Sequence, residues 1–219
     1  RSLVFNREVL FLTFLILGVS IFSTIALRVD NIYDKGSEAF FHSLFQATAI
    51  VSTTGLSTAD WAAWPHLCQA LLFFLFFVGG CSGSTSGGVK CIRWLILVKS
   101  IYCACRRRIH PRGVFQVRLH GKNLSQEVLE SVWLFFLIYF LTMAVTTLTI
   151  TALGLDLTTA FSASASAIAN VGPALGAIGT GSYADIPGPA KAVLSMCMLL
   201  GRLEFYSFVV LFFPEFWRR

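Results

Sequence analysis

Apolar and polar residues form long blocks along this chain, and the order of the blocks repeats once. Residues 9–27 and 132–153 are apolar segments close to the ~20 residues that a spanning helix needs. A shorter apolar segment follows each of them, at residues 39–50 and 157–168, and about 12 residues are too few to span a bilayer. The pattern therefore predicts two copies of a spanning helix followed by a re-entrant one.

Each short apolar segment runs into a polar turn, and a further apolar segment follows the turn. The first turn holds Ser-Thr-Thr-Gly at residues 52–55, and the second holds Asn-Val-Gly-Pro at residues 170–173. The apolar segment after the first turn, residues 67–105, is interrupted at residues 79–88 by glycines and hydroxyls, which form a helix poorly. The segment after the second turn covers residues 190–213.

These blocks predict an all-α membrane protein built from two helix–pore-helix–helix repeats. Local signals mark two of the helix starts. Asp156 precedes the second short helix as a candidate cap, and Asn123 with Gln126 matches a capping box. The predicted division of the chain is a first pore repeat at residues 1–105, a basic loop at residues 106–124 and a second pore repeat at residues 125–219.

The composition supports a membrane location. Hydrophobic residues make up 56% of the 219 residues and charged residues 13%, with a mean hydropathy of +0.73, whereas a soluble domain carries about 25% charged residues. We therefore expect a multi-pass protein in contact with membrane lipid. The sequence has no initiator Met and leads almost directly into an apolar helix, so we expect a piece of a longer protein.

The basic residues behind the net charge of +6 gather in the loop between the repeats and near the two ends of the chain. Cytoplasmic loops of membrane proteins carry an excess of Lys and Arg. Both termini and the basic loop are therefore predicted on the cytoplasmic side. This topology signal accounts for the cluster without a nucleic-acid partner. The residues are Arg106, Arg107, Arg108, Arg112, Arg118 and Lys122 in the loop, with Arg1, Arg7, Arg218 and Arg219 at the ends.

The two polar turns are candidate strips of an ion selectivity filter. Backbone that leaves the helical state at membrane depth must be buried in protein or line a water-filled cavity, and a ring of carbonyls can replace the water shell of a cation. Glycine reaches backbone angles that let successive carbonyls point at one axis. Either turn alone is more often an ordinary loop or helix end, but the repeated placement favours the filter. The predicted ion-binding residues are Thr53, Thr54, Gly55, Leu56, Asn170, Val171, Gly172 and Pro173.

The glycine-rich break and Arg202 are candidates for gating. Non-helical backbone at residues 79–88 again needs a cavity, so this segment is a candidate plug anchored by Lys90, with a simple packing kink as the alternative. Arg202 falls midway along the last apolar segment, where a charge costs ~2.5–3.5 kcal/mol. A functional Arg202 would face the pore or an acidic partner in another part of the protein, whereas a structural Arg202 would form a buried ion pair. For Glu204 the functional and the structural role are equally open. The predicted gating residues are Gly79, Gly80, Ser82, Gly83, Ser84, Gly87, Gly88, Lys90 and Arg202.

Catalytic interpretations are weaker. The run Gly80-Cys81-Ser82-Gly83 matches an intramembrane serine-protease pattern, but no histidine lies at mid-depth in a predicted spanning helix to activate the serine. The same run lacks the Gly-Lys-Ser/Thr of a phosphate-binding loop. The six cysteines show no zinc-ligand spacing. We expect free thiols, no cofactor, no enzyme activity, and no metal site other than a cation at the filter carbonyls.

Four motifs taken together resemble the Trk/Ktr/HKT superfamily of potassium transporters, most closely its bacterial TrkH type. The motifs are residues 52–60, 79–90, 170–173 and 201–202. The resemblance implies a K+-channel-like pore of four helix–pore-helix–helix repeats, of which this chain carries two, similar to the third and fourth. The chain would then be a C-terminal half with half of the filter, and it would need the missing N-terminal half to conduct K+, the transported ion.

The same resemblance implies how the gate works and which partners bind. Residues 79–88 would form an intramembrane gating loop, and Arg202 would lie below the filter against it as an electrostatic barrier. The resemblance also implies a bacterial inner membrane, a homodimer and a cytosolic nucleotide-binding regulatory ring, for which residues 106–122 are a candidate docking surface. The resulting hypothesis is K+ uptake through a carbonyl-lined filter. The alternative is a non-conducting membrane module that assembles with or regulates another membrane protein.

Overall fold

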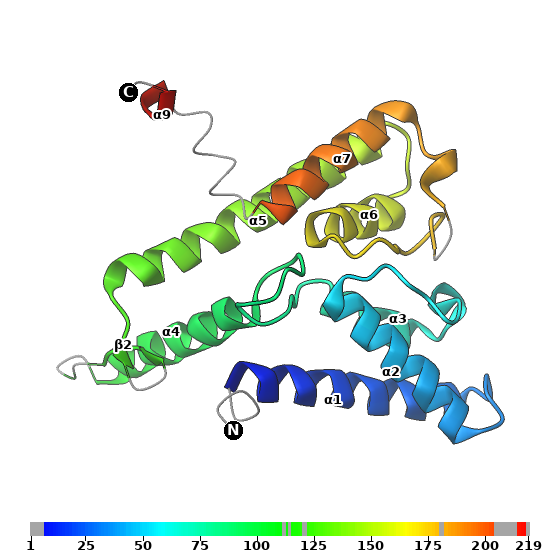
Figure 1. Cartoon of the computed structure of the whole chain (residues 1–219), viewed down its shortest axis with the longest axis horizontal. Coiled ribbons are helices and arrows are strands. Elements are labelled where there is room, and N and C mark those ends of the chain that lie inside the picture. Colours follow the sequence, from blue (N-terminus) through cyan, green and yellow to red (C-terminus); the bar gives the residue numbers. More distant parts are fainter. Residues whose placement is uncertain are drawn as a thin grey trace.

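The structure contains two copies of a long helix followed by a shorter one (Figure 1). The first copy is α1 (Arg7–Val29) with α2 (Gly36–Ser52), and the second is α5 (Gln126–Ala152) with α6 (Leu157–Ala169). The computed structural model describes residues 7–110, 113, 115–119, 122–179, 182–203 and 214–217.

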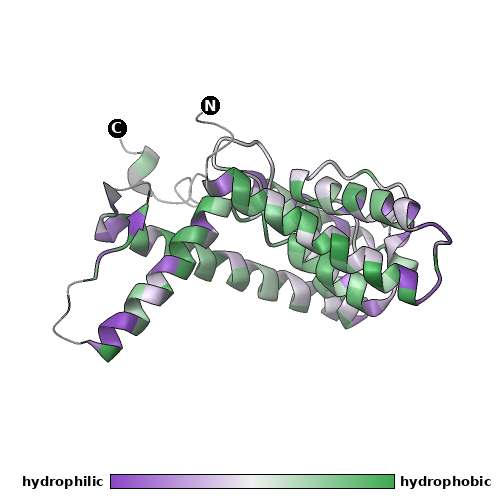
Figure 2. Ribbon diagram, turned by 90° about the horizontal axis from the view of Figure 1, so that it is seen from below, coloured by the Kyte–Doolittle hydropathy of each residue, from purple (hydrophilic) through white to green (hydrophobic). Residues whose placement is uncertain are grey.

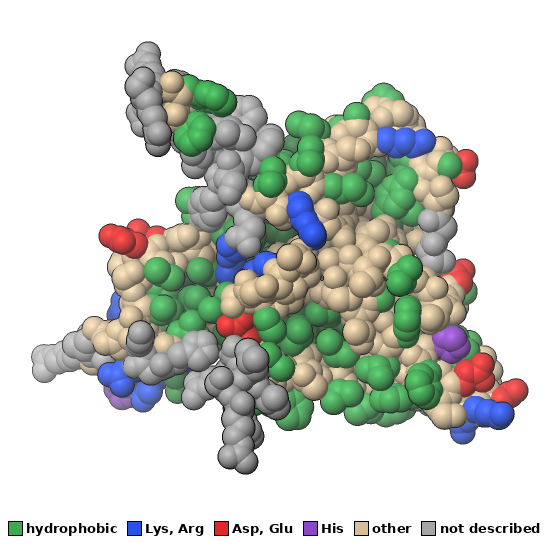
Figure 3. Space-filling view, in the orientation of Figure 1, with side chains coloured by type: hydrophobic (Ala, Val, Ile, Leu, Met, Phe, Trp, Pro, Cys, Tyr) green, Lys and Arg blue, Asp and Glu red, His purple; other side chains and the backbone are tan. Residues whose placement is uncertain are grey.

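The two long helices have the length and the surface of membrane spans. Residues Glu8–Val29 and Gln126–Ala152 are both long and apolar enough to cross a bilayer. Large apolar side chains point outward from them, with Phe14 72% exposed on α1 and Leu148 69% exposed on α5. Hydrophobic side chains cover α1 on the face shown in Figure 3, and hydrophilic residues gather towards the ends of the molecule in Figure 2. The exposed apolar surface therefore suits lipid rather than water.

The apolar segment after the first turn is divided as the glycines predicted. A 3-10 turn, η1 (Trp61–Ala63), leads into α3 (His66–Leu75), and after the glycine-rich loop the chain resumes as α4 (Cys91–Ile109). Helix α4 extends further than the hydropathy indicated, because three arginines continue its last turn. Their positive charges stabilise the helix, because the free carbonyls at its C-terminal end carry a partial negative charge.

In the second repeat, η2 (Tyr183–Asp185) leads into α7 (Gly188–Arg202), and a short helix α9 covers Pro214–Trp217. The last apolar segment was predicted as one helix over residues 190–213. Its first part is α7, and residues 204–213, which include Glu204, lie outside the described residues.

The short helix α6 is the most deeply buried element. All of its residues except Leu157, Thr158 and Phe161 are buried. Its alternating Ala and Ser side chains are small enough to let other helices approach closely, and α6 packs against both α5 and α7 (Figure 1). In the first repeat, α1 packs on both α2 and α3.

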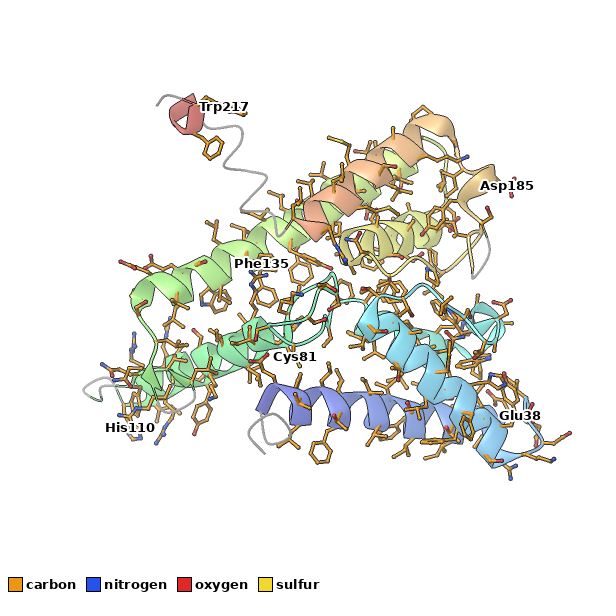
Figure 4. The ribbon with its side chains drawn as sticks, in the orientation of Figure 1. Glu38, Cys81, His110, Phe135, Asp185 and Trp217 are labelled. Atoms are coloured by element: carbon orange, nitrogen blue, oxygen red, sulfur yellow. The ribbon has the colours of Figure 1, made fainter. Side chains whose placement is uncertain are left out.

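Helix α4 leaves its own repeat and packs mainly on α5 of the other. The guanidinium carbon of Arg93 lies 3.9 Å from the ring centroid of Phe135, which projects from α5 towards α4 (Figure 4). Trp94 and Phe136 form an edge-to-face pair with centroids 5.0 Å apart. The two repeats are therefore joined by side-chain packing as well as by the connecting loop.

The two predicted helix starts have different outcomes. The cap at α6 is confirmed, because Asp156 accepts a hydrogen bond from the amide of Thr159 at 3.0 Å. The capping box at Asn123 and Gln126 is wrong, because α5 begins directly at Gln126 with no side-chain cap. Asn123 instead lies in a small antiparallel pair, β1 (Arg118–Leu119) with β2 (Lys122–Asn123). The side-chain oxygen of Asn123 accepts a hydrogen bond from Arg118 Nε at 2.9 Å. It therefore does not cap the first amides of α5.

Candidate functional site

The two polar turns have the same backbone conformation. Thr53 at the end of α2 has φ 55° and ψ 39°, and Asn170 at the end of α6 has φ 57° and ψ 37°. Each donates its amide to the carbonyl three residues back at 3.1 Å. The next residues, Thr54 and Val171, donate to the carbonyls five residues back at 3.1 and 3.0 Å. This is a Schellman helix end, formed independently by two different sequences.

A glycine with positive φ follows two residues later in both turns. Gly55 has φ 71° and Gly172 has φ 105°, values that side chains with a Cβ adopt only under strain. The turns also meet in space. A Cβ on Gly172 would lie 3.5 Å from the Cα of Gly55, and a Cβ on Gly55 would lie 3.4 Å from the carbonyl oxygen of Val171. The two predicted filter strips are thus direct neighbours.

Most backbone carbonyls of these turns are without a hydrogen-bond donor. Within the described part of the chain, no hydrogen bond reaches the carbonyl oxygens of Thr53, Thr54, Gly55, Leu56, Asn170, Val171 or Pro173. Unpaired carbonyls are rare away from water. A cluster of them has the chemistry of a site for a cation that has lost its water shell. No group of His, Cys, Asp and Glu among the described residues could hold a metal ion in their place.

The carbonyl of Gly172 is the exception. It accepts a hydrogen bond from the hydroxyl of Tyr183 at 2.7 Å, so Tyr183 holds the second turn from the side of η2. The sequence analysis did not select Tyr183. Its pairing with Gly172 depends on the path of the connection after the turn, for which the sequence pattern gives no signal.

The glycine-rich loop closes on itself between α3 and α4. The amide of Gly79 donates to the carbonyl of Val89 at 2.8 Å, and the amide of Cys91 donates to the carbonyl of Gly80 at 3.1 Å. In Figure 4, Cys81 of this loop lies midway between His110 at one end of the molecule and Asp185 at the other. The loop therefore lies about midway between the two ends of the molecule.

Lys90 is hydrogen-bonded to this loop. Its ammonium group is buried and donates to the carbonyls of Ser84 and Ser86, the second at 2.7 Å. The hydroxyl of Ser86 also accepts from the amide of Gly80 at 2.9 Å. The loop thus has a specific hydrogen-bonded shape, rather than being a simple kink in a helix.

The loop, the last helix and the second turn converge on the end of α6. A side chain at Gly87 would collide with the backbone carbonyl of Ala169, and one at Gly201 would collide with that of Ile168. The side-chain amide of Asn170 donates to the carbonyl of Met198 on α7 at 3.2 Å. Close approach therefore requires glycine at Gly87, one of the predicted gating positions, and at Gly201, which precedes the predicted Arg202. The same holds at the predicted position Gly79, where a Cβ would collide with the carbonyl of Gly87.

Arg202 shares a cavity with the loop. The cavity has a volume of about 330 Å³ and is lined by Ser84, Thr85, Ser86, Gly88, Lys90, Gly201 and Arg202. Two cationic residues therefore border one polar space next to the second turn. Gly83 is separate from this arrangement, because a Cβ on it would meet nothing within 4 Å.

Ser82 is held from outside the loop by Glu8, which the sequence analysis did not select. Glu8 is only 3% exposed. One carboxylate oxygen accepts from the amide of Ser82 at 2.9 Å and the other from its hydroxyl at 3.4 Å. An acid at the start of an apolar span was a signal that could have identified it.

Comparison with known proteins gives a consistent result over the whole chain. Residues 3–219 match the family described as "TrkH: Cation transport protein". The Trk system potassium uptake protein TrkH of Halomonas elongata is 38% identical over 98% of this chain and 44% of its own length. TrkI of the same organism is 43% identical over 80% of this chain and 36% of its own length.

The fold agrees with a solved structure of the same kind. The crystal structure of the potassium transporter TrkH from Vibrio parahaemolyticus matches with a TM-score of 0.89 and 37% identity, over 97% of this chain and 45% of that one. The all-α repeat architecture and the resemblance inferred from the motifs are confirmed. The chain spans less than half of the length of these relatives, from 36% of TrkI to 44% of TrkH from Halomonas elongata.

Proposed function

The chain belongs to the TrkH family of cation transport proteins, and on this premise we propose that it forms two of the four pore repeats of a potassium uptake protein. The observation that carries the proposal is the contact between two turns of identical geometry. Gly55 and Gly172 lie against one another, and the carbonyls around them accept almost no hydrogen bonds. A helix end of this kind leaves carbonyl oxygens without donors, and a bound cation would satisfy them.

In the proposed pathway, K+ sheds water into the carbonyls of Thr53 to Leu56 and of Asn170 to Pro173. Two further strips from the missing N-terminal half complete the ring. Fixed carbonyl dipoles replace the hydration shell of the ion. A negative-inside membrane potential contributes about 2.3 kcal/mol per charge for each 100 mV. The Gly172 carbonyl also accepts the hydroxyl of Tyr183, which holds the turn in shape and leaves the second lone pair of this oxygen for the ion.

The glycine-rich loop and Arg202 form the proposed gate. Lys90 and Glu8 hold the loop in the observed shape from two sides, and the loop packs under the second turn through Gly87. Arg202 borders the same cavity, where a fixed positive charge opposes the entry of a cation. Movement of the loop away from this cavity would open the path.

The proposed setting is a bacterial inner membrane with both termini and the basic loop in the cytoplasm. The arginines at the end of α4 support this orientation through the positive-inside rule. The proposed division of the chain keeps residues 1–105 and 125–219 as the two pore repeats. A homodimer and a cytosolic nucleotide-binding ring that docks near the basic loop complete the proposal.

Growth of a bacterium that lacks its own K+ uptake systems tests this function. The complete reading frame that contains this chain is expressed beside the 219-residue chain, with membrane expression of both verified. Rescue at limiting K+ by the complete protein, with a matching rise in cell K+, is expected. If neither form restores growth or K+ content although both reach the membrane, the chain is instead part of a non-conducting module.

A further inference from the structure

A pocket far from the proposed filter lies where α4 ends and β1 begins. It has a volume of about 510 Å³ and is open on one side. Two aromatic rings and two guanidinium groups form most of its wall. The lining residues are Tyr102, Cys103, Arg106, Phe115, Gln116 and Arg118. Neither the filter nor the glycine-rich loop contributes to it.

Arg106 is held in this pocket by aromatic rings. Its guanidinium carbon lies 4.9 Å from the ring centroid of Phe115 and 5.7 Å from that of Tyr102. Such contacts fix the position of a cation while leaving its charge in place. Within the described part of the chain, the guanidinium group of Arg106 donates no hydrogen bond, and only the backbone carbonyl of Arg106 accepts one, from the amide of His110. Its planar set of N–H donors is therefore available to an anion, and this geometry matches phosphate and carboxylate.

Among the residues that the structure describes, no acid is paired with the cations around the pocket. Lys99 and Arg107 donate to the backbone carbonyls of Arg118 and Phe115, at 2.8 and 3.2 Å. Arg118 donates to the neutral side chain of Asn123. Glu130 is the acid in the adjoining cavity of about 130 Å³, which Arg107 also lines. Glu130 accepts its side-chain hydrogen bond from Gln126 at 3.3 Å. The pocket therefore has an excess of positive charge.

Aromatic residues place the pocket at the depth of lipid headgroups. Tyr102 on α4 is 60% exposed and Trp133 on α5 is 47% exposed. The indole N–H of Trp133 donates to the hydroxyl of Ser100 at 3.3 Å, which ties the two helices together there. Amphipathic rings of this kind gather at membrane interfaces. His110, eight residues after Tyr102, lies at the outermost end of the molecule (Figure 4).

We propose that this pocket binds the phosphate of an anionic phospholipid. Arg106 and Arg118 contact the phosphate, while the rings of Tyr102 and Phe115 contact the glycerol and the first part of the acyl chains. Basic pockets at the cytoplasmic ends of spanning helices suit such headgroups. The inference goes beyond the proposed function and is independent of the ion path, because it is measured as lipid binding.

The test is a binding measurement on the purified complete protein in a neutral detergent. Short-chain phosphatidylglycerol is titrated and its retention is read by native mass spectrometry, with phosphatidylcholine and inorganic phosphate as parallel titrations. Arg106→Gln and Arg118→Gln are each expected to weaken phosphatidylglycerol binding about fivefold, the effect of one basic charge at a membrane surface. Arg108→Gln is the matched control, since it removes the same charge from the same helix end but lines neither cavity.

The proposal is supported if phosphatidylglycerol binds, phosphatidylcholine does not, and only the pocket variants lose affinity. An equal loss in Arg108→Gln would overturn it, because the attraction would then come from the net charge of the helix end. Competition by inorganic phosphate at the same concentration as the lipid would identify a small-anion site instead. Unchanged lipid binding in Arg106→Gln, with loss of a cytosolic protein partner, would assign the pocket to that partner.

Discussion

Gly172 lies against Gly55, so closely that a Cβ on Gly172 would be 3.5 Å from the Cα of Gly55. The two residues belong to different repeats, and each has a positive φ that glycine alone adopts without strain. A change at either position therefore alters both turns, and the turns behave as one unit.

The first prediction concerns this pair. Gly172→Ala should lower K+ uptake by the complete protein about tenfold and reduce its preference for K+ over Na+, because a Cβ at positive φ costs ~1–2 kcal/mol and displaces the turn. Gly18→Ala is the control, since a Cβ there meets nothing within 4 Å. Competition of Na+ and K+ in a flux assay measures the effect. Unchanged selectivity in Gly172→Ala would remove the filter assignment.

The second prediction separates packing from conduction. Gly201→Ala should destabilise the protein by about 1–3 kcal/mol, the usual cost of overpacking, because its methyl group meets the carbonyl of Ile168 at the end of α6. Thermal unfolding in detergent is the measurement. Gly188→Ala lies in the same helix with open space around it, and it should unfold at the wild-type temperature. Equal stability of both variants would contradict the close approach of α7 and α6.

The third prediction concerns Glu8 and the loop. Glu8→Ala removes the acceptor for the amide and hydroxyl of Ser82, so the loop should open more often and K+ leak should rise several-fold, the effect of losing a hydrogen bond worth ~1 kcal/mol. Glu8→Gln keeps one acceptor and should show a smaller rise. Flux in proteoliposomes measures both, with the exposed Glu127→Gln as a control. A leak in Glu127→Gln as large as in Glu8→Ala would contradict this role.

The fourth prediction concerns Arg202. Arg202→Ala should raise K+ flux roughly tenfold, the effect of removing ~1.4 kcal/mol of electrostatic barrier, whereas Arg202→Lys should keep most of the barrier. Lys191→Ala, at the other end of α7, should leave the flux unchanged. If flux in Arg202→Ala equals that of the wild type while thermal stability falls, Arg202 is a structural charge.

The fifth prediction is a pH dependence at the start of α6. Hydrogen bonds from Thr159 lower the pKa of Asp156, so its carboxylate stabilises the helix cap at neutral pH. The contribution is present above the ordinary Asp pKa and is lost as the pH falls through the lowered value in the folded protein. Asp156→Ala should reduce stability by about 1 kcal/mol at pH 7. The difference from wild type in thermal unfolding should shrink in acid, and a constant difference would contradict the assignment.

Hydropathy and glycine placement were sufficient to predict the repeated helices and the two turns. Those features depend on neighbouring residues, since a short apolar segment cannot span a bilayer and a left-handed helix end favours Gly or Asn nearby. The same reasoning located the break before α4.

Contacts between distant segments were not predictable in this way. The bond from Ser82 to Glu8 and the bond from Tyr183 to Gly172 depend on how the helices pack, and many partners were compatible with each side chain. For Asn123, by contrast, a contact was predicted that the structure does not contain. Its spacing from Gln126 matched a cap, but a pair of short strands held it in another conformation.

The packing of α4 on α5 also has a consequence for biosynthesis. Helix α4 precedes α5 in the chain and is synthesised first, so Arg93 at first lacks the ring of Phe135 that covers it in the final structure. A charge in that position favours an early intermediate in which α4 stays near the aqueous surface until α5 arrives. The pair of repeats, rather than each repeat, is then the smallest part of the chain that the insertion machinery can release as a finished unit.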